Sequence, residues 1–566
     1  MSLDDQSRSD IEDFVPFPPD LVAQYRQRGL WSNRTISESL HASATDYPRH
    51  PAVMTPDQAE RLSYAELDRR TDEVAFGLHQ LGLRAGERVL LQLGNQAITV
   101  VAWYGLLKAG LVPIATLPHH REHELFEIAR QAEPAAHIVD IAFPSNDLRL
   151  LARNTAAAQP SVRVRITVNA DIPCDDEVAL ESLGAGVSAD AARCLVETIQ
   201  RDIDPDSVAV LQLSGGTTSI PKLIPRLHAE YWYNAEEYAR AIELTEDSCV
   251  AHVLPVVHNA GIVCGVHAAH AVGACFATCR HDAEQLQLLA DRCQPTHLFM
   301  APPVAQMVLE RPQLRHRVQG VDVVVWTLGK IPQKVREAFE TSACRIQQLY
   351  GQGEGLCMVT PADASIDIRH NTVGIPISPL DEVRIYAPGT EEPVDPGTPG
   401  ELCCRGPYTT RGYFRGGPRN REAFTTDGFY RTGDIAVEIV ADGRSLYAIE
   451  DRLKDVISRG GEKINALEVE GLLAGHPAIR AAALVAMPDE RLGERACAFI
   501  VPADGAQPLS LEDLKVYLNY KGVAKFKWPE RIEIRYSLPV NSTDKVNKAL
   551  LRNEIAELLA RQHTPR

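Results

Sequence analysis

Segments with the apolar periodicity of helices and of strands alternate along the first part of the chain. Residues 62–82 carry apolar side chains at helical spacing, and residues 87–93 form a short apolar run typical of a buried strand. A second helical segment at 97–110 is followed by the strand-like residues 111–117. Because strand, helix and strand in this order form parallel sheets covered by helices, the alternation predicts an α/β fold.

The sequence changes character twice towards its C-terminus. From about residue 374 it is rich in glycine, proline and β-forming residues, which predicts a small β subdomain. Beyond residue 464, helical and strand-like segments alternate again. Since 566 residues are too many for one hydrophobic core, we expect a large domain at 1–452, with two α/β layers and the β subdomain. A small α+β domain is expected at 453–566.

Charge and composition exclude several classes of partner. The net charge is −17 and no long basic run occurs, which argues against nucleic acid or an anionic membrane as the main partner. The acidic N-terminus lacks the apolar segment of a signal peptide. The most apolar stretch, residues 250–277, contains several histidines and is a poor lipid-facing helix. We expect it to be buried core around a polar site, in a cytoplasmic protein whose twelve cysteines are free thiols.

The same stretch holds residue types that bind metals. These are Cys264, His267, His270, Cys275 and, just beyond it, Cys279. Their spacing fits no standard pairing of zinc ligands. Cysteine is also a common small core residue, so packing is the favoured interpretation here and for the cysteine pair at 403–404.

Five polar motifs occur in a fixed order. They are "LQLSGGTTSIPKLIPR" at 211–226, "LPVVHNAG" at 254–261, "WTLGK" with "QQLYGQGEG" at 326–355, "TDGFYRTGDIA" with "IEDRLKDVISRGGEKI" at 426–464, and "LPVNSTDKVNK" at 538–548. The first is not a P-loop, because Lys222 lies between Pro221 and Leu223 instead of between a glycine and a hydroxyl residue. Any one of these motifs alone is a weak signal.

Together the motifs resemble those of the adenylate-forming superfamily, which includes acyl-CoA synthetases, luciferases and nonribosomal peptide adenylation domains. The resemblance runs from about residue 30 to 555. It is strongest to stand-alone aryl acid–AMP ligases of the 2,3-dihydroxybenzoate and salicylate type, through "LSGGTT", "KLIPRLH", "HN", "QLYGQGEG" and "RGGEKI". It implies ATP-dependent conversion of a salicylate-like acid to aryl-AMP, with release of pyrophosphate. The aryl group then passes to the pantetheine thiol of an aryl carrier protein in siderophore or other nonribosomal peptide or polyketide biosynthesis.

The resemblance also assigns the nucleotide site, with ATP and Mg²⁺ as cofactors. Glu354 and Thr217 are assigned to the metal, because Mg²⁺ prefers oxygen ligands. Asp434 is expected to accept the ribose hydroxyls, and Tyr350 to pack on adenine. An alternative is that Asp434 merely pairs with Arg452. The residues assigned to ATP are Ser214, Gly215, Gly216, Thr217, Thr218, Lys222, Gly329, Lys330, Tyr350, Gly351, Gln352, Asp434 and Arg452.

Catalysis and domain motion are assigned in the same way. Lys545, together with His258, is the expected catalytic residue, since a lysine is a compact charge on a flexible stem. Lys454 matches the hinge about which the C-terminal domain of this family moves as a lid after adenylation.

The acid pocket is expected around "HNAGIVC". The amide of Asn259 suits an ortho hydroxyl and a carboxylate. Cys264 favours salicylate over 2,3-dihydroxybenzoate, because a thiol is a weak hydrogen-bond partner for a 3-hydroxyl. Ala260 replaces a larger aromatic residue and predicts a deeper pocket. The full predicted lining is His258, Asn259, Ala260, Cys264, Thr327, Gly329, Leu349, Cys357 and Met358.

Several positions depart from the family pattern. Lys330, Ser219, Asp451 and Asp544 each replace a glycine. Lys330 either meets a further acidic group of the substrate or points to solvent. The glycine losses at Ser219, Asp451 and Asp544 leave open an adenylate-binding protein without turnover. An aryl-CoA ligase that uses free CoA also stays open, because CoA and a carrier protein present the same pantetheine arm.

Overall fold

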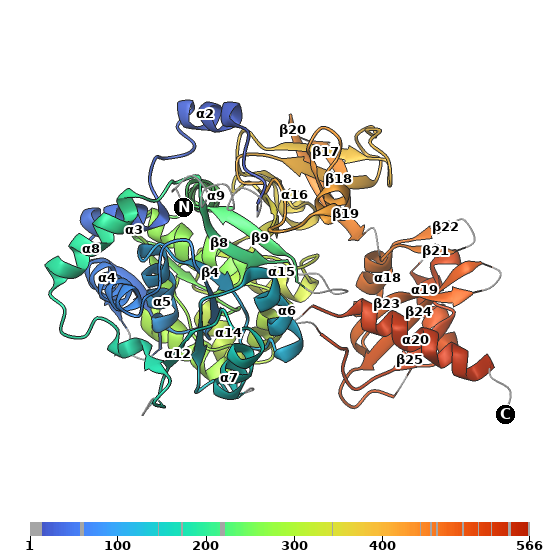
Figure 1. The fold of residues 1–566 in the computed structure, drawn as a ribbon. Coiled ribbons are helices and arrows are strands. Elements are labelled where there is room, and N and C mark those ends of the chain that lie inside the picture. Colours follow the sequence, from blue (N-terminus) through green and yellow to red (C-terminus); the bar gives the residue numbers. More distant parts are fainter. Residues whose placement is uncertain are drawn as a thin grey trace. The chain divides into compact units, whose positions relative to one another are not determined.

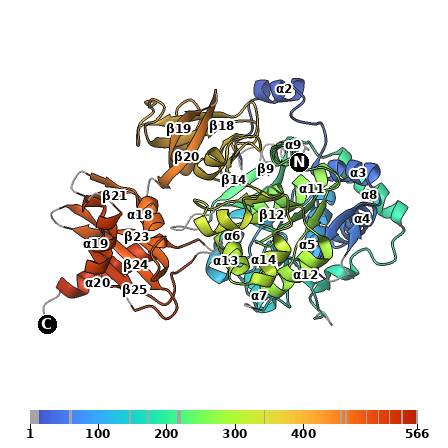
Figure 2. The ribbon, with the colours of Figure 1, turned by 180° about the vertical axis from the view of Figure 1, so that it is seen from behind.

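The computed structural model (Figures 1 and 2) is described in two units. The first contains residues 14–214, 221–382 and 404–430, and the second contains 383–403 and 431–563. The structure describes residues 14–56, 61–144, 147–170, 174–214, 221–341, 343–441, 443–452, 455–459, 462–489, 492–507, 509–521, 523, 525–540 and 545–563, without the side chains of 451, 452, 458, 462, 463, 493, 562 and 563.

The first unit contains two large sheets, as the alternation of segments predicts. One has the order β7 (Val178–Ala179), β6 (Val164–Val168), β5 (Ala136–Asp140), β3 (Arg88–Gln92), β4 (Val112–Ala115), β8 (Val208–Leu213) and β9 (Leu223–Leu227). The other has the order β16 (Ile375–Pro376), β15 (Gly355–Val359), β14 (Arg345–Gln352), β13 (Val323–Trp326), β12 (His297–Met300), β10 (Cys249–Ala251), β11 (Cys275–Ala277), β1 (Pro51–Met54) and β2 (Leu62–Ser63). Neighbouring strands from β1 to β14 are parallel, so their carboxyl ends meet at one edge.

Helices connect and cover these strands. The predicted helix at 62–82 is α4 (Tyr64–Gln80), which begins at a capping box of Ser63 and Glu66. The helix at 97–110 is α5 (Ala97–Lys108), whose side chains are almost all buried, as expected for a helix enclosed by other elements. Figures 1 and 2 show α4 and α5 side by side.

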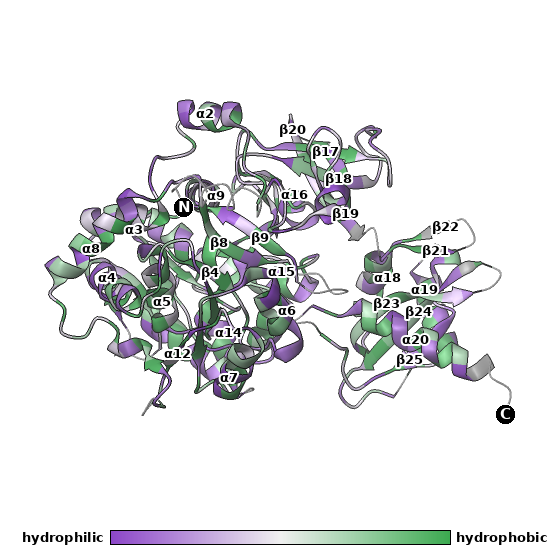
Figure 3. Ribbon diagram, viewed as in Figure 1, coloured by the Kyte–Doolittle hydropathy of each residue, from purple (hydrophilic) through white to green (hydrophobic). Residues whose placement is uncertain are grey.

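The remaining helices of the first unit are shorter on average. They are α2 (Pro19–Gln27), α3 (Ile36–Asp46), α6 (Glu122–Ala132), α7 (Leu148–Ala158), η2 (Leu180–Ser182), α8 (Ala189–Arg201), α9 (His228–Ala241), α10 (Asn259–Gly261), η3 (Ile262–His267), α11 (Ala268–Ala271), α12 (Ala283–Cys293), α13 (Pro302–Leu309), α14 (Pro312–Val318), α15 (Gln333–Phe339), α16 (Ile366–Asn371) and α17 (Pro418–Ala423). One hydrophobic core joins residues of both sheets to α4, α5 and α9. Hydrophobic residues dominate β4 and β8 in Figure 3.

The second unit contains the predicted β subdomain and α+β domain. A four-stranded sheet has the order β17 (Glu382–Tyr386), β18 (Gly400–Arg405), β19 (Tyr430–Ala441) and β20 (Arg444–Arg452). A five-stranded sheet is built from β22 (Glu462–Ile464), β21 (Ile457–Arg459), β24 (Gly493–Pro502), β23 (Ile479–Asp489) and β25 (Arg531–Ile534), with helices α18 (Ala466–Ala474), α19 (Leu511–Tyr520), η4 (Lys525–Lys527) and α20 (Lys548–His563). The α/β fold class is confirmed, whereas the domain boundary at 452–453 stays a prediction.

The apolar stretch at 250–277 is divided among several elements. It contains β10, α10, the π-helix η3, α11 and β11, and most of its side chains are buried. In the described part of the chain, none of the helices combines the length and the apolar character that crossing a bilayer requires. Cys403 and Cys404 of β18 are buried, as the packing interpretation predicts.

Candidate active site

The first motif is a hairpin whose ends are joined by hydrogen bonds. Ser214, just after β8, donates its backbone N–H to the carbonyl of Lys222 at 3.0 Å. Lys222 in turn donates its N–H to the Ser214 hydroxyl at 3.0 Å. These two residues therefore close the base of the loop. Its predicted ATP contacts Gly215, Gly216, Thr217 and Thr218, like Ser219, lie outside the described residues.

Lys222 and Glu354 meet at one tyrosine. The Tyr413 hydroxyl donates to Oε1 of Glu354 at 2.9 Å. The Lys222 ammonium lies 3.4 Å from that hydroxyl and 4.4 Å from the centroid of the ring. Burial raises the pKa of Tyr413, so its hydroxyl stays protonated. A cation and a buried carboxylate thus lie beside one another at the end of the loop, an arrangement that suits a phosphate and a hard metal ion.

The amide of Asn259 is held in one orientation by two donors. Its Oδ1 accepts from the Tyr231 hydroxyl at 2.9 Å and from Nη1 of Arg226 at 3.3 Å. Because the oxygen is the atom that accepts, the Nδ2 group carries the two free N–H donors. Nδ2 makes no hydrogen bond within the described part of the chain, and the residue is half-buried. Asn259 therefore presents donors to an oxygen of a ligand.

Arg226 is the centre of this arrangement and is fully buried. Its guanidinium forms a bidentate pair with Glu230, with distances of 2.9 and 2.8 Å, and it also donates to the carbonyl of Gly353 at 3.0 Å. The guanidinium lies 4.4 Å from the Tyr231 ring. Arg226 is the last residue of the motif at 211–226, and the family resemblance assigns it no role. The signal was the acidic residue four positions later: Arg226 lies in β9, and Glu230 lies in the first turn of α9.

Cys264 lies in the π-helix η3, next to the buried Tyr238. Burial raises the pKa of the Cys264 thiol, which stays neutral. Cys357 belongs to the same buried core cluster as Cys264. Single π-helical turns are frequent at functional sites. Two predicted lining residues, far apart in sequence, are therefore buried in the same core cluster.

The other predicted lining residues divide between two faces of β14 and β15. Leu349 and Cys357 belong to the large core, whereas Met358 is paired with Tyr350 on the opposite face. Thr327 follows β13 and precedes two residues at positive φ, Leu328 at +67° and Gly329 at +122°. Lys330 is exposed, and Gln352 donates to the Tyr350 hydroxyl at 3.0 Å.

Asp381 is a buried carboxyl that sequence reasoning did not single out. Tyr408 donates its hydroxyl to Oδ2, and the N–H of Ser378 donates to the same oxygen at 3.3 Å. Oδ1 is inaccessible and has no hydrogen-bond partner in the described residues. Burial raises the pKa of Asp381 to about 8, against the lowering effect of these hydrogen bonds. The carboxyl is therefore protonated near neutral pH.

This pKa predicts that Asp381 makes the protein less stable as the pH rises. Between 3.8, the ordinary pKa, and about 8, the unfolded chain binds fewer protons at this position than the folded protein does. The free energy of unfolding then falls with increasing pH. In Asp381→Asn, which does not titrate, stability relative to the parent should be higher at pH 8 than at pH 5. Urea midpoints of both proteins at the two pH values measure this, and an equal difference at both would contradict it.

Four predicted site residues, Asp434, Arg452, Lys454 and Lys545, belong to the second unit. Asp434 is 4% exposed and lies directly opposite Arg452 in the register of β19 and β20. The side chain of Arg452 and all of Lys454 lie outside the described residues. Lys545 is half-buried. The roles of these residues in ATP binding, catalysis and hinge motion stay predictions.

The histidines proposed as alternative metal ligands are engaged in the core. Nε2 of His267 accepts from the Trp103 indole at 3.1 Å, and Nδ1 of His270 lies 2.8 Å from the Tyr104 hydroxyl. Across the described ranges, no three His, Cys, Asp or Glu side chains are grouped to hold a metal ion. All twelve cysteines are free thiols.

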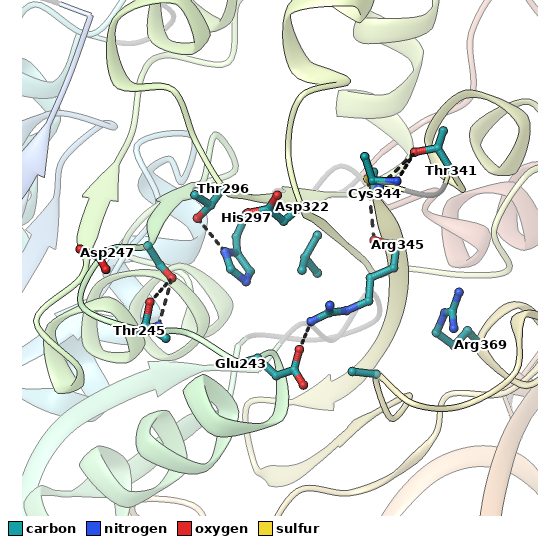
Figure 4. Close-up of a pocket in the computed structure, with 14 residues that line it drawn as sticks. Glu243, Thr245, Asp247, Thr296, His297, Asp322, Thr341, Cys344, Arg345 and Arg369 are labelled. Atoms are coloured by element: carbon teal, nitrogen blue, oxygen red, sulfur yellow. Dashed lines mark hydrogen bonds and ion pairs between the residues drawn. The ribbon is translucent and has the colours of Figure 1, made fainter.

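A separate surface pocket of about 660 Å³ contains none of the predicted site residues (Figure 4). It lies where β10, β12, β13 and β14 begin, at the edge opposite their carboxyl ends. Arg345 and Glu243 form an ion pair in it, and Thr296 contacts the ring of His297 at 2.9 Å. Ligands of open α/β sheets bind at the carboxyl ends of the strands, which favours the edge with Asn259, Thr327 and Leu349.

Comparison with known proteins agrees with this geometry. Residues 40–414 match the model of the AMP-binding enzyme family, and residues 468–545 match the AMP-binding enzyme C-terminal domain. The salicyl-AMP ligase / salicyl-S-ArCP synthetase of Mycobacterium tuberculosis is 36% identical over 96% of this chain and 94% of its own length. A 2-hydroxy-7-methoxy-5-methyl-1-naphthoate–CoA ligase of Streptomyces carzinostaticus is 36% identical, over 95% and 96%.

A solved structure shows the same fold. The apo structure of MbtA from Mycobacterium smegmatis is 34% identical, with a TM-score of 0.70, and the match covers 96% of this chain and 99% of that chain. The family match extends over more than half of the chain and includes the hairpin loop, Asn259 and Glu354. This chain therefore belongs to the AMP-binding enzyme family.

Proposed function

We propose that this protein is an aryl acid–AMP ligase that activates a salicylate-like acid with ATP. The observation that carries the proposal is the orientation of Asn259. Arg226 and Tyr231 donate to its oxygen, so its Nδ2 donors, which have no partner among the described residues, suit a ligand that offers oxygen acceptors. A carboxylate with an ortho hydroxyl is such a ligand. The names of the two relatives above, which act on ortho-hydroxy aryl acids, support this class.

The reaction needs positioning and cationic charge more than a protein nucleophile. The carboxylate oxygen forms a bond to the α-phosphorus of ATP, the bond to the bridging oxygen breaks, and pyrophosphate leaves. Since an anion attacks a polyanion, stabilisation by preorganised charges provides most of the catalysis. Lys222 supplies one such charge at the loop, with hydroxyl and N–H donors expected from the loop itself. His258 and Lys545 are proposed to act at the acid carboxylate.

The residues present fit Mg²⁺ as the second cofactor. Glu354 is buried and offers a hard carboxylate, one oxygen of which accepts from Tyr413. Glu354 would hold the ion, which neutralises phosphate charge when bound. Thr217, the second predicted ligand, lies outside the described residues. Asp434, buried at 4% exposure, is proposed to bind the ribose.

The acceptor of the aryl group is proposed to be the pantetheine thiol of an aryl carrier protein in siderophore or related biosynthesis. Free CoA is the second candidate, favoured by the relative named as a naphthoate–CoA ligase. Both acceptors present the same thiol arm, so thiolation assays with each acceptor distinguish them. A protein without turnover would give no acid-dependent exchange of pyrophosphate into ATP.

A panel of acids on two variants tests the proposed pocket. In the parent, salicylate should exceed benzoate in kcat/KM, because benzoate leaves the Asn259 donors unpaired at a cost of about 1–3 kcal/mol. Asn259→Ala should erase this preference. Ala260→Tyr should reject bulkier substituted salicylates while retaining salicylate. The kcat/KM for 2,3-dihydroxybenzoate should not exceed that for salicylate, because the Cys264 thiol is a weak hydrogen-bond partner for the 3-hydroxyl. The kcat/KM for each of the four acids is measured by pyrophosphate exchange.

The KM for ATP is the control in this panel. It should change little in both variants, since neither residue is assigned to the nucleotide. A parent enzyme that prefers benzoate, or any acid without an ortho donor, would show that the salicylate-type assignment is wrong.

A further inference from the structure

His252 lies on the same face of the sheet as the predicted acid pocket. It directly follows β10, in which Ala251 is paired with Leu298, so His252 lies at the level of Phe299 of β12. Phe299 is paired with Val325, and Val325 with Gln347. Paired residues of parallel strands point to one face. His252 thus begins a row that runs across the sheet under the core helices.

The predicted lining residues Thr327 and Leu349 form the next layer of this face. Each lies two residues beyond a member of the row, Val325 and Gln347 respectively. A step of two residues along a strand covers roughly 6–7 Å towards the carboxyl edge, and the side chain reached lies on the same face of the sheet. His252 therefore lies one layer deeper than the predicted lining.

Neither ring nitrogen of His252 has a hydrogen-bond partner in the described part of the chain, although the residue is 0% exposed. Burial lowers the pKa of His252 to about 3, so the ring is neutral and carries one donor and one acceptor. A buried polar group without a partner costs folding free energy. By contrast, the buried His270 of the same stretch has partners at both nitrogens, the Tyr104 hydroxyl and the carbonyl of Ala52.

The side chains around His252 are apolar, and η3 packs closely against it. Its ring lies 4.6 Å from the Phe299 ring and 6.5 Å from the Phe276 ring, measured between centroids. Above it, η3 carries Gly265, where an added Cβ would lie 3.7 Å from the His252 Cβ. The residue before Gly265 is Cys264, a predicted lining residue. A π-helix with a glycine at this point lets the helix approach the histidine closely.

We infer that His252 hydrogen-bonds a polar substituent of the aryl acid, on the side of the ring remote from the carboxylate. The inference rests on the proposed function and names its substrate class: an ortho-hydroxy aryl acid, of one or two rings, with a hydroxyl, amino or alkoxy group at its far side. Asn259 recognises the carboxylate end, and Ala260 leaves room for the larger acid. His252 is thus a specificity-determining residue.

Two variants of His252 and one control test this inference. His252→Leu removes both hydrogen-bonding atoms, and His252→Asn keeps one donor group and one acceptor. His270→Leu is the matched control, because it removes a buried neutral histidine from the same core but from a site whose nitrogens are already satisfied. Pyrophosphate exchange at saturating ATP is measured with salicylate, its 4-hydroxy, 5-hydroxy and 4-amino derivatives, and hydroxylated 2-hydroxynaphthoates.

The expected result is a change of selectivity, not of overall activity. At least one polar-substituted acid should exceed salicylate in kcat/KM by about ten-fold or more in the parent and in His270→Leu. His252→Leu should abolish this ratio while salicylate itself changes less than about three-fold, and His252→Asn should retain part of it. Should His252→Leu fail to fold, the ratio in His252→Asn still tests the inference.

Two results would overturn the inference. One is a parent that gains nothing from any polar substituent, and the other is a parallel loss for every acid in the His252 variants, which would make the residue structural. Failure of the proposed function looks different, because then no aryl acid in the panel would support exchange in the parent.

Discussion

Replacing Lys545 with alanine is expected to lower the rate of adenylation about 100- to 1,000-fold, which corresponds to the loss of one preorganised charge at the reacting centre. Lys545 is a half-buried lysine that directly precedes the bridge residue Val546. Family resemblance assigns it to the acid carboxylate and the α-phosphate in the adenylation pose alone. Transfer from a preformed aryl adenylate to a thiol should therefore survive in the variant.

The two half-reactions are measured separately. Pyrophosphate exchange reports adenylation, and single-turnover transfer from synthetic aryl-AMP to CoA or carrier protein reports thiolation. Lys515→Ala is the matched control, because Lys515 belongs to the same unit and pairs only with the exposed Glu512 on its own helix among the described residues. It should leave both rates unchanged. If both half-reactions fell equally in Lys545→Ala, the assignment of Lys545 to a single pose would be wrong.

Arg226→Met is expected to cost about 3–5 kcal/mol of folding free energy. The substitution leaves Glu230, which is 2% exposed, as a buried carboxylate without its cation. Breaking one partner of a buried ion pair is far more harmful than removing both. The double variant Arg226→Met/Glu230→Leu should therefore regain much of the lost stability. The free energy of unfolding of the parent, the single variant and the double variant is measured by urea unfolding, which is followed by tryptophan fluorescence.

The double variant also separates stability from specificity. It lacks the Arg226 donor that holds the oxygen of Asn259, so the preference for salicylate over benzoate should weaken although the protein is folded. Arg130→Met is the control for a surface pair, because Arg130 and Glu127 are paired on the exposed side of α6. Its loss should leave the free energy of unfolding almost unchanged, because water and salt screen an exposed ion pair. A double variant as unstable as Arg226→Met would contradict the ion-pair argument.

Much of the fold follows from local sequence patterns. The helix over 62–82, the strands at 87–93 and 111–117, and the later β-rich region all occur where periodicity and composition predict them. Polar and apolar spacing reports which face of an element is buried, and this is sufficient for the fold class. The spacing does not specify which distant strands become neighbours.

The site was predicted unevenly for the same reason. Motif resemblance pointed to Asn259, Glu354 and Lys222, because each lies in a short, recognisable run. It assigned no role to Arg226, which donates to Asn259, or to Tyr413, which donates to Glu354. Those contacts join positions 33 and 59 residues apart in the chain. Their existence depends on how β9, α9 and the segment after β18 pack.

The sequence by itself thus determined the α/β class, the family and the chemical types in the site, because these depend on residue identity and short-range spacing. The tertiary structure alone decided that the Asn259 oxygen is the atom that accepts hydrogen bonds, that burial raises the pKa of Asp381, and that His252 has no hydrogen-bond partner among the described residues. Each of these is a consequence of burial and of the register between strands. Burial and register arise only when segments distant in sequence exclude water from one another.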